Sequence, residues 1–529
     1  MSAISVSGVS SGVDWMSLID QLKKAEQSKV ELLEKEKTRY QDRMSAWQEI
    51  NTLLLSFMEE AEDLNRASDF NIHVTSLASN SSTESEDILS ASAGTDAAPG
   101  TYTVVVQSLA AAEKLATRSF TSQDEALGLS GDLVIGGQSV SVESTDTLLN
   151  LRDKINDVNR GTEASGVRAS IVNYGDNGYR LILTSESEGS SGMSLSNGGA
   201  EDLLGALEFV QVQAGADAVI TVDGFTVTSE SNTIDDVISG VTLDLKQADS
   251  DTTVTLTVGR DYEAVKEAIG EFVDSYNEVI KAVNKQFSYD AEDGKAGGPL
   301  FGDSTLRAIR SKMTSIVTRQ ISGASDAFST LGLIGIKIGT DRTLSIDDNT
   351  LQGHLETNFE DVMNLFVANY MSTNGHVSYL RHGVDTQEGT YNIHIDGTDP
   401  LEGYFVEPGD ASGSGGYLTG ESGGADGLVI RYTGTATGEI GTFTLNYGVA
   451  ELIHRELHQI TDSLDGYVAN KKESLQSSID RIEKNIQKTE DRIDRKMEVL
   501  TRQYIAMEQA LSEMQSLSNW MSQQLAFLQ

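Results

Sequence analysis

Residues 464–529 carry one apolar stripe that predicts a long helix. Apolar side chains recur in steps of three, four or seven, with one four-four stutter near Ile493, and sustained heptads of this kind are typical of a coiled coil. No Pro or Gly follows Gly466, so a continuous helix of roughly 90 Å is expected at 1.5 Å per residue. The stripe consists of Leu475, Ile479, Ile482, Ile486, Ile493, Met497, Leu500, Tyr504, Met507, Leu511, Met514, Met521, Leu525 and Leu528.

The charges on this predicted helix are unevenly distributed. As far as Arg502, acids and bases form i,i+4 partners such as Glu498 and Arg502, as expected for the flanks of a helix seam. No base follows Arg502, and the remaining residues are mainly Gln, Ser, Met and aromatics with Glu508 and Glu513. Such a surface can pack against other copies without burying many charges. The other interpretation is an ordinary helix inside a bundle.

A second stripe begins near the other end of the chain. Asp14 can cap a helix that starts at Trp15, and the clearest part of its stripe is Trp47, Ile50, Leu54, Phe57, Ala61 and Leu64. Two such stripes can pair with each other, which would make the whole middle of the chain an insertion between the arms of a stalk. The alternative is that each end packs on neighbouring molecules.

The region from about 101 to 260 is predicted to be rich in β-strands. Its first unit shows a hairpin (133–142), a short capped helix (146–156) and a second hairpin (167–184), with Gly-rich turns between paired strands. A second unit begins with a hairpin at 218–227, and residues 232–238 with the strands that follow repeat the plan. We therefore expect two related β-domains.

Helical spacing returns after residue 261. Residues 262–287, 306–321 and 358–370 are predicted helices of one bundle, with a short hairpin inside 328–348. Residues 375–448 are predicted to be a separate antiparallel sheet module around a Gly/Ser-rich loop, 409–424, before helix resumes.

These patterns predict a multidomain α+β protein with long terminal coiled-coil helices, a helical bundle stalk and inserted antiparallel β-rich domains. The expected boundaries are an N-terminal coiled-coil arm at 1–46, the first helix of the bundle domain at 47–84, a β-rich domain at 85–112 and 212–260, an inserted β-rich domain at 113–211, a helical bundle core at 261–374, an inserted β-sheet module at 375–448, a bundle return helix at 449–470 and a C-terminal coiled-coil arm at 471–529.

Composition excludes several partners. The 529 residues include 80 Asp and Glu against 39 Lys and Arg, and the formal charge of -41 repels nucleic acids and anionic membrane surfaces. No apolar run approaches the length of a membrane span, and the start of the sequence has neither a basic nor a hydrophobic signal region. The absence of Cys excludes disulfide scaffolds and thiolate metal sites. We expect no nucleic acid partner, no membrane insertion and no cleaved general-secretion signal.

Motifs for catalysis are weak. Gly8–Gly12 and Gly420–Gly424 both fit G-x-S-x-G, but neither lies at a predicted strand-to-helix turn. His454 and His458 have the i,i+4 spacing of a metal site without the Glu of H-E-x-x-H or an evident third ligand. Residues 290–294 fall short of a calcium loop. We therefore expect no enzyme, no cofactor and no metal site.

Over nearly its full length the sequence resembles the flagellar filament-capping proteins, the FliD or hook-associated protein 2 family. The resemblance rests on the opening Gly8-Val-Ser-Ser-Gly-Val-Asp14, on Phe225 to Asn284 with Ser231-Asn-Thr-Ile-Asp-Asp-Val-Ile-Ser-Gly-Val-Thr-Leu243 and Phe272-Val-Asp-Ser-Tyr-Asn277, and on Gly298-Pro-Leu-Phe-Gly-Asp-Ser-Thr-Leu306, Leu331-Gly-Leu333 and Gly339 to Ile346. Residues 131–184 resemble the flagellin hook IN motif. The departure is the insertion at 375–448, which many relatives lack or replace.

This resemblance implies a cap at the distal tip of the bacterial flagellar filament. A ring of copies, with terminal helices as legs and β-domains as a plate, would prevent flagellin leakage and promote flagellin polymerisation and filament elongation. The implied partners are other copies of the chain, flagellin, hook-filament junction proteins and a flagellar export chaperone at the C-terminal helix. Export would use the flagellar type III apparatus without a cleaved signal peptide.

Two other functions are alternatives. One is a surface adhesin that binds host or matrix glycans through its β-domains, either instead of capping or as a second role. The other is a flagellin or junction protein, which residues 231–243 and 299–306 disfavour. For the cap, we expect apolar stripes without a partner in the monomer, so that assembly orders them. The expected assembly stripe is Trp47, Ile50, Leu54, Phe57, Leu64, Leu475, Ile479, Ile482, Ile486, Ile493, Leu500, Met507, Leu511, Met514 and Leu525.

Overall fold

The computed structural model describes residues 12–290, 294–399, 401–406 and 411–526. The chain divides into two compact units, residues 71–265 and the combination of 1–70 with 266–529. The first unit is built mainly from strands, and the second from helices with an inserted pair of sheets. The predicted α+β fold with long terminal helices and inserted antiparallel β-structure is confirmed.

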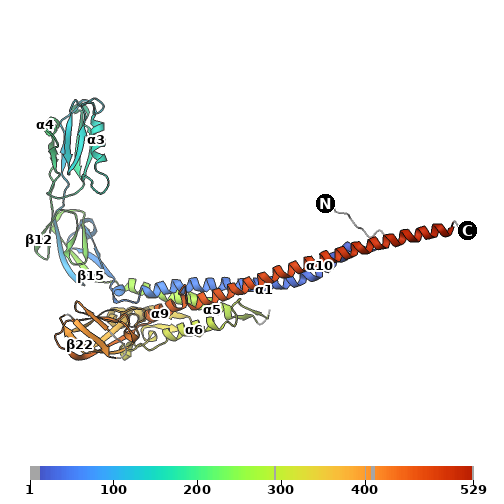
Figure 1. Ribbon diagram of the computed structural model, residues 1–529. Coiled ribbons are helices and arrows are strands. Elements are labelled where there is room, and N and C mark those ends of the chain that lie inside the picture. The colour runs from blue at the N-terminus through green and yellow to red at the C-terminus, as the bar shows by residue number, and fades with distance from the viewer. Residues whose placement is uncertain (1–11, 291–293, 400, 407–410, 527–529) are drawn as a thin grey trace. The chain divides into compact units, whose positions relative to one another are not determined.

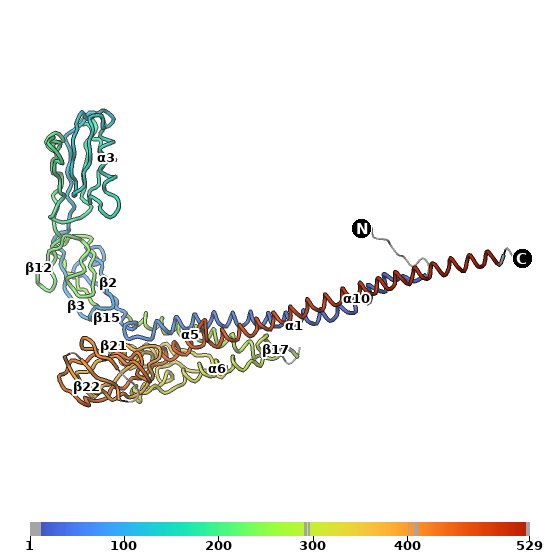
Figure 2. Tube along the Cα trace, in the orientation of Figure 1, coloured from blue at the N-terminus to red at the C-terminus, as the bar shows by residue number. Residues whose placement is uncertain are grey.

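The two terminal helices lie side by side and antiparallel (Figure 1, Figure 2). Helix α1 spans Trp15–Glu62 and helix α10 spans Tyr467–Ala526. Lys23 of α1 lies 3.3 Å from Asp494 of α10, whereas Lys37 lies 2.9 Å from Glu483, so rising numbers in one helix meet falling numbers in the other. Neither helix contains Pro or Gly, which leaves the backbone hydrogen bonds uninterrupted.

The second half of α1 is buried in a bundle with α5 (Tyr262–Phe287), α6 (Ser304–Val317) and α9 (Val449–Thr461). Phe57 of α1 packs against Phe272 and Tyr276 of α5, with ring centroids 5.1 and 5.8 Å apart. The three-four spacing of the stripe places Trp47 and Leu54 on the same face as Phe57, and all three are fully buried.

A short hairpin is fastened to α5. It consists of β18 (Ile336–Ile338) and β19 (Leu344–Ile346) and is followed by α7 (Asp348–Thr357) and α8 (Phe359–Asn364). Asn277 donates to the carbonyl of Leu344 at 2.9 Å and accepts its N–H at 2.7 Å. The helix expected over 358–370 is too long, because α8 ends at Asn364 and the chain enters strand β20 (Ala368–Ser372).

The insertion contains two four-stranded antiparallel sheets. Their strand orders are β20-β27-β22-β23 and β21-β26-β25-β24. The strands are β21 (Val377–Arg381), β22 (Gly389–Thr398), β23 (Leu401–Val406), β24 (Ala411–Ser414), β25 (Tyr417–Gly420), β26 (Val429–Tyr432) and β27 (Gly438–Tyr447). Ile393 and Phe443 from one sheet share a buried core with Leu418 and Ile430 from the other.

The Gly/Ser-rich loop expected at 409–424 is wrong for the described residues from 411 onward. Strands β24 and β25 form a hairpin there, closed at Gly415 and Gly416. Both glycines have positive φ, +59° and +86°, which a two-residue turn between twisted strands requires. Glycine richness in this segment therefore marks a tight turn.

The β-rich unit has two hydrophobic cores. One lies between the five-stranded sheet β1-β15-β3-β11-β12 and the three-stranded sheet β13-β14-β2, and the other lies among β10-β4-β8-β7, β6-β5-β9 and two helices. The strands are β1 (His73–Ser79), β2 (Leu89–Ala93), β3 (Gly100–Ser108), β4 (Lys114–Ala116), β5 (Gly131–Ile135), β6 (Gln138–Val142), β7 (Val167–Asn173), β8 (Tyr179–Ser185), β9 (Leu195–Asn197), β10 (Val210–Gln213), β11 (Ala218–Val222), β12 (Phe225–Ser229), β13 (Thr233–Ile238), β14 (Val241–Leu245) and β15 (Asp249–Arg260), and the helices are α3 (Leu148–Asp157) and α4 (Leu203–Leu207).

The repeated plan holds for the first unit and not for the second. Hairpins β5-β6 and β7-β8 flank α3, whose N-terminus has a capping box between Thr147 and Asn150. Residues 233–238, by contrast, form strand β13 in place of a helix. Ile234 and Ile238 are four positions apart, a spacing that places two side chains on one face in a helix and also in a strand, and both lie in the same core. Asn232 fixes this strand, because its amide exchanges two hydrogen bonds with the backbone of Ala110.

Candidate assembly surface

The expected assembly stripe divides into three parts. The first part is buried in the helical bundle, and none of its residues is more than 1% exposed: Trp47, Ile50, Leu54, Phe57 and Leu64. The second part lies on α10 and is 3–7% exposed: Leu475, Ile479, Ile482, Ile486 and Ile493. Leu500 packs, partly buried, against Ile19, and the face that these residues share is turned toward α1 in the region where the two helices run together.

The expectation that both stripes lack a partner within the monomer is therefore wrong for most of their length. The α1 stripe is buried in the bundle, and the α10 stripe is buried against the first half of α1, because the two helices run antiparallel from the bundle to the start of α1. This favours the first of the two arrangements considered from sequence, in which the ends of one chain pair with each other.

Ion pairs flank the paired stripes. Lys496 of α10 lies 2.8 Å from Glu26 of α1, and Lys29 lies 2.7 Å from the same carboxylate. Hydrogen bonds from Lys29 first, and then from Lys496, lower the pKa of Glu26 to about 2. Both bases hold this carboxylate ionised, so it marks the register of the two helices.

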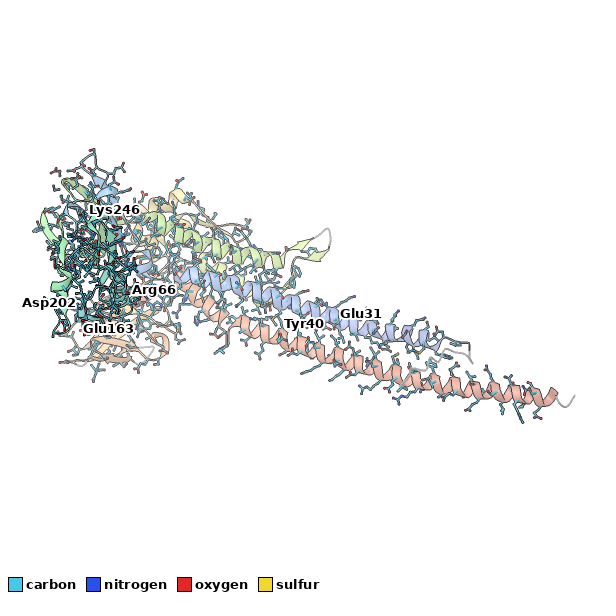
Figure 3. All side chains as sticks on the ribbon, turned by 90° about the horizontal axis from the view of Figure 1, so that it is seen from above. Glu31, Tyr40, Arg66, Glu163, Asp202 and Lys246 are labelled. Atoms are coloured by element: carbon cyan, nitrogen blue, oxygen red, sulfur yellow. The ribbon has the colours of Figure 1, made fainter. Side chains whose placement is uncertain are left out.

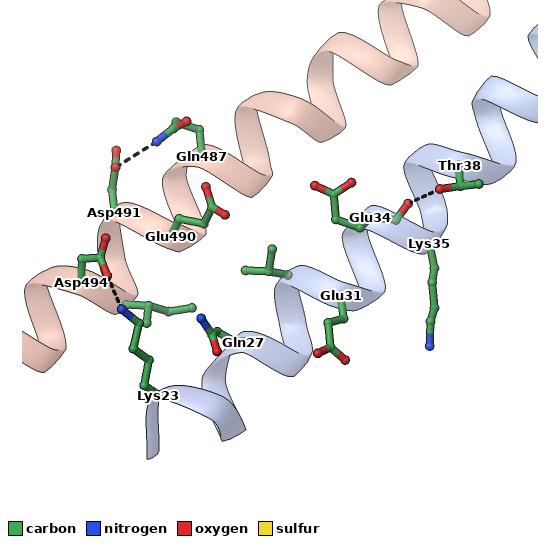
Figure 4. Close-up of a pocket in the computed structure, with 12 residues that line it drawn as sticks. Lys23, Gln27, Glu31, Glu34, Lys35, Thr38, Gln487, Glu490, Asp491 and Asp494 are labelled. Atoms are coloured by element: carbon green, nitrogen blue, oxygen red, sulfur yellow. Dashed lines mark hydrogen bonds and ion pairs between the residues drawn. The ribbon is translucent and has the colours of Figure 1, made fainter. Parts of the chain in front are cut away.

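A polar cavity of about 880 Å³ interrupts the helix pair (Figure 4). It is lined mainly by charged and amide side chains, including Gln27, Glu31 and Glu490, with Val30 and Ile493 as its apolar members. The stripe on α10 skips one turn here, between Ile486 and Ile493, and the cavity lies at that gap. The stutter noted in the sequence thus corresponds to a loosely packed stretch.

Asp303 joins three helices at the base of the pair. Its Oδ1 caps α6 by accepting the N–H groups of Thr305 and Leu306. Its Oδ2 lies 3.3 Å from Nζ of Lys471 on α10 and 3.7 Å from Nη2 of Arg43 on α1. The sequence alone gave no signal for the two cations that share this carboxylate.

Beyond Tyr504, the end of α10 exposes apolar side chains. Trp15 at the start of α1 stacks on Tyr504, with centroids 4.6 Å apart, so about 33 Å of helix continues past this contact. Figure 3 shows α10 extending past α1, whose residues Glu31 and Tyr40 lie along the paired part. The exposed apolar residues are Met507 (36%), Met514 (62%), Leu517 (60%), Trp520 (57%) and Met521 (52%), while Leu511 is intermediate. The side chain of Leu525 and all of Leu528 lie outside the described residues.

Leu517 and Trp520 were missed in the sequence analysis. The heptad template passes from Met514 to Met521 and leaves both of them off the stripe. The sequence feature that could have indicated them is the absence of charged residues after Glu513. The apolar surface of this helix end is therefore wider than a single heptad stripe.

The weak catalytic and metal-binding motifs of the sequence can be compared with the described structure. Among the described residues, no group of three or more His, Asp or Glu side chains has a geometry that could hold a metal ion. His454 and His458 have ring centroids 6.5 Å apart, and burial lowers the pKa of His454. Most of Gly8–Gly12 and the middle of 290–294 lie outside the described residues.

Long paired terminal helices, inserted β-structure and an exposed apolar helix end define a structural protein that assembles with others. Residues 215–516 match the family model for the C-terminus of flagellar hook-associated protein 2, and residues 11–113 match the model for its N-terminus. The chain belongs to this family, the flagellar cap proteins also called FliD.

The chain is similar to proteins from several bacteria. Flagellar hook-associated protein 2 of Xenorhabdus nematophila is 28% identical over 75% of this chain and 89% of the relative. B-type flagellar hook-associated protein 2 of Pseudomonas aeruginosa is 30% identical over 68% of this chain and 81% of the relative. The crystal structure of domains D1-D2-D3 of the flagellar cap protein FliD from Escherichia coli is 28% identical, with a TM-score of 0.49, and covers 61% of this chain and 89% of that chain.

Membership settles the class of function. Proteins of this family are structural flagellar cap proteins and not enzymes, and their place is the tip of the flagellum, outside the cell. Within the described part of the chain, none of the helices combines the length and the apolar character that crossing a membrane requires.

Proposed function

We propose that several copies of this chain form a ring at the distal tip of the filament, which prevents flagellin leakage and promotes flagellin polymerisation. The exposed end of α10 carries the proposal. Met514, Leu517 and Trp520 expose more than half of their surface on a helix that has only Glu508 and Glu513 as charges after Arg502. Exposed apolar patches on soluble proteins mark interaction sites, so this end fits a hydrophobic channel or groove of the filament.

The rest of the α1–α10 pair suits a leg. Its apolar stripes are buried within the chain and its flanks carry ion pairs, so it needs no neighbour to stay folded. The leg would hold the apolar end at a fixed distance from the bundle, since Asp303 ties both helices to α6. A stiff spacer with an adhesive end can remain in contact with the filament while new flagellin is added.

The same apolar end accounts for the other proposed partners. Before export, exposed Trp520 and its neighbours would favour aggregation, and a flagellar export chaperone that covers the C-terminal helix would prevent this. Export through the flagellar type III apparatus would need no cleaved signal peptide. Hook-filament junction proteins would be the first surface on which the ring sits.

A complementation experiment tests this function. In a strain lacking the gene, the triple variant Met514→Ser, Leu517→Ser and Trp520→Ser should leave flagellin monomers in the medium and few filaments. These side chains are exposed, so the fold should survive, and an unchanged circular dichroism spectrum would verify it. The control is Leu464→Ser, which removes a side chain that is 86% exposed near the bundle. Normal filament length with the triple variant would refute the proposal.

A further inference from the structure

A groove of about 700 Å³ lies where the inserted sheets meet the helical bundle. Its walls are the segment Asn65–Ser68 after α1, the strands β20 and β21, the loop 382–385 and one face of α9. Strand β20 is an outermost strand of one sheet and β21 of the other, so two unpaired edges border the groove. Open strand edges are surfaces to which other chains bind.

The floor of the groove is held by a buried polar network. The hydroxyl of Tyr379 lies 2.5 Å from Nδ1 of His382, and Nε2 of His382 lies 2.8 Å from the carboxylate of Glu451, which is 4% exposed. Arg455 donates to the backbone carbonyls of Gly383, Val384 and Thr386. Burial, and then the charge of Glu451, raise the pKa of Tyr379 to about 12, so its hydroxyl stays protonated. The loop 382–385 is therefore fixed before any partner arrives.

The rim exposes apolar anchors. Tyr370, Leu380 and Val384 are 46%, 52% and 64% exposed, and the ring of Tyr370 contacts that of Tyr379 in a tilted arrangement, with centroids 5.3 Å apart. Aromatic residues and arginines are enriched at the centres of protein interfaces, where they carry much of the binding energy. Asn65 lines the same groove, and its Oδ1 is buried with no hydrogen-bond partner in the described structure.

The charge of the groove is unusual for this chain. Three arginines and three histidines line it, against the two carboxylates of Asp385 and Glu451. Arg66 and Arg381 are exposed, and Arg381 forms no ion pair with any described residue. The whole chain, by contrast, has about twice as many acids as bases and a formal charge of -41. Two copies therefore repel each other over most of their surfaces, and a cationic groove is where an acidic copy can approach.

We infer that this groove docks a second copy of the chain, with Leu380 and Val384 as apolar anchors and Arg66 and Arg381 facing acidic side chains of the neighbour. The inference rests on the proposed ring and names one surface of its subunit interface. The insertion at 375–448 would then take part in assembly, because its strand edges, exposed apolar side chains and positive charges lie together at the groove.

Sedimentation of the full-length protein tests the inference. Arg66→Glu with Arg381→Glu should raise the dissociation constant for self-association at least tenfold, and Leu380→Ser should do so independently of charge. The matched charge control is Arg160→Glu with Arg168→Glu, two exposed guanidinium groups of the β-rich unit, and the matched apolar control is Leu464→Ser. Both controls should assemble like the wild type.

The possible outcomes separate the two proposals. If the wild type assembles and the groove variants assemble equally well, the groove is not the subunit interface, and the proposed ring is unaffected. If the wild type stays monomeric at every concentration tested, both proposals fail. If the groove variants form normal oligomers but no longer sediment with flagellin filaments, the groove binds flagellin and the second-copy assignment is overturned.

Discussion

The indole Nε1 of Trp15 donates a 2.8 Å hydrogen bond to Oε1 of Glu508, a carboxylate that is 6% exposed although it lies near the free end of α10. The same indole stacks on Tyr504. Two residues separated by 493 positions thus mark the place where the helix pair ends and the unpaired end of α10 begins.

Trp15→Phe should loosen this junction. Phenylalanine can still stack on Tyr504, but the buried Glu508 loses one donor, which costs about 1–3 kcal/mol of local stability. Hydrogen exchange should become faster for the amides of the first two turns of α1, while the amides around Trp47 keep their protection. Unchanged exchange at the start of α1 would mean that the hydrogen bond does not hold the helix end.

Asp303→Asn should weaken the base of the helix pair. Asparagine still caps α6, but Lys471 and Arg43 lose their shared carboxylate. We expect a loss of about 1–3 kcal/mol, because the carboxylate is buried while both cations are about a third exposed.

Asp303→Ala is the matched variant for urea unfolding. It removes the cap as well as the ion pairs and should cost about 1 kcal/mol more than Asp303→Asn. Equal stability of Asp303→Asn and the wild type would show that the ion pairs contribute nothing.

Glu26 should titrate far below an ordinary glutamate. Its pKa in the folded state is about 2 against 4.5, so the stability that it contributes is present above pH 4.5 and is lost as the pH falls toward 2. In a carboxyl-carbon NMR titration, Lys29→Ala should raise the midpoint more than Lys496→Ala, since Lys29 is the larger cause. A midpoint near 4.5 in the wild type would contradict the pairing of this carboxylate with either lysine.

Asn277→Ala should destabilise the hairpin behind α5. The substitution leaves the N–H and the carbonyl of Leu344 without their partner in a buried place, at a cost of about 2–4 kcal/mol. Asn284→Ala is the control, because Asn284 also bonds this hairpin, at Asp341, but in an exposed position. Thermal unfolding that ranks the two variants equally would argue against burial as the reason.

Helix periodicity gave the terminal helices reliably from the sequence, because the stripes from Trp47 to Leu64 and from Leu475 to Leu500 follow helical spacing with no Pro or Gly. Helix periodicity does not indicate which other helix buries these apolar stripes. That answer depends on antiparallel pairing between residues almost 500 positions apart, such as Trp15 and Glu508.

Shorter elements were harder to predict. Strand β13 could be taken for a helix because residues four apart, such as Ile234 and Ile238, share a face in both structures, and the Gly-rich segment at 415–416 forms a turn between strands. The groove beside the insertion also had no sequence signal, since Asn65, Arg381 and His454 meet only in the fold. The domain boundaries drawn from the sequence stay predictions.

Photo-crosslinking from Trp520 tests the central claim most directly. A photoreactive phenylalanine analogue at position 520, in cells that are extending filaments, should give a covalent adduct with flagellin, whereas the same analogue at Leu464 should give none. Adducts with flagellin at 520 alone would place the apolar end of α10 against the filament. Adducts at neither position, or equal adducts at both, would contradict the account.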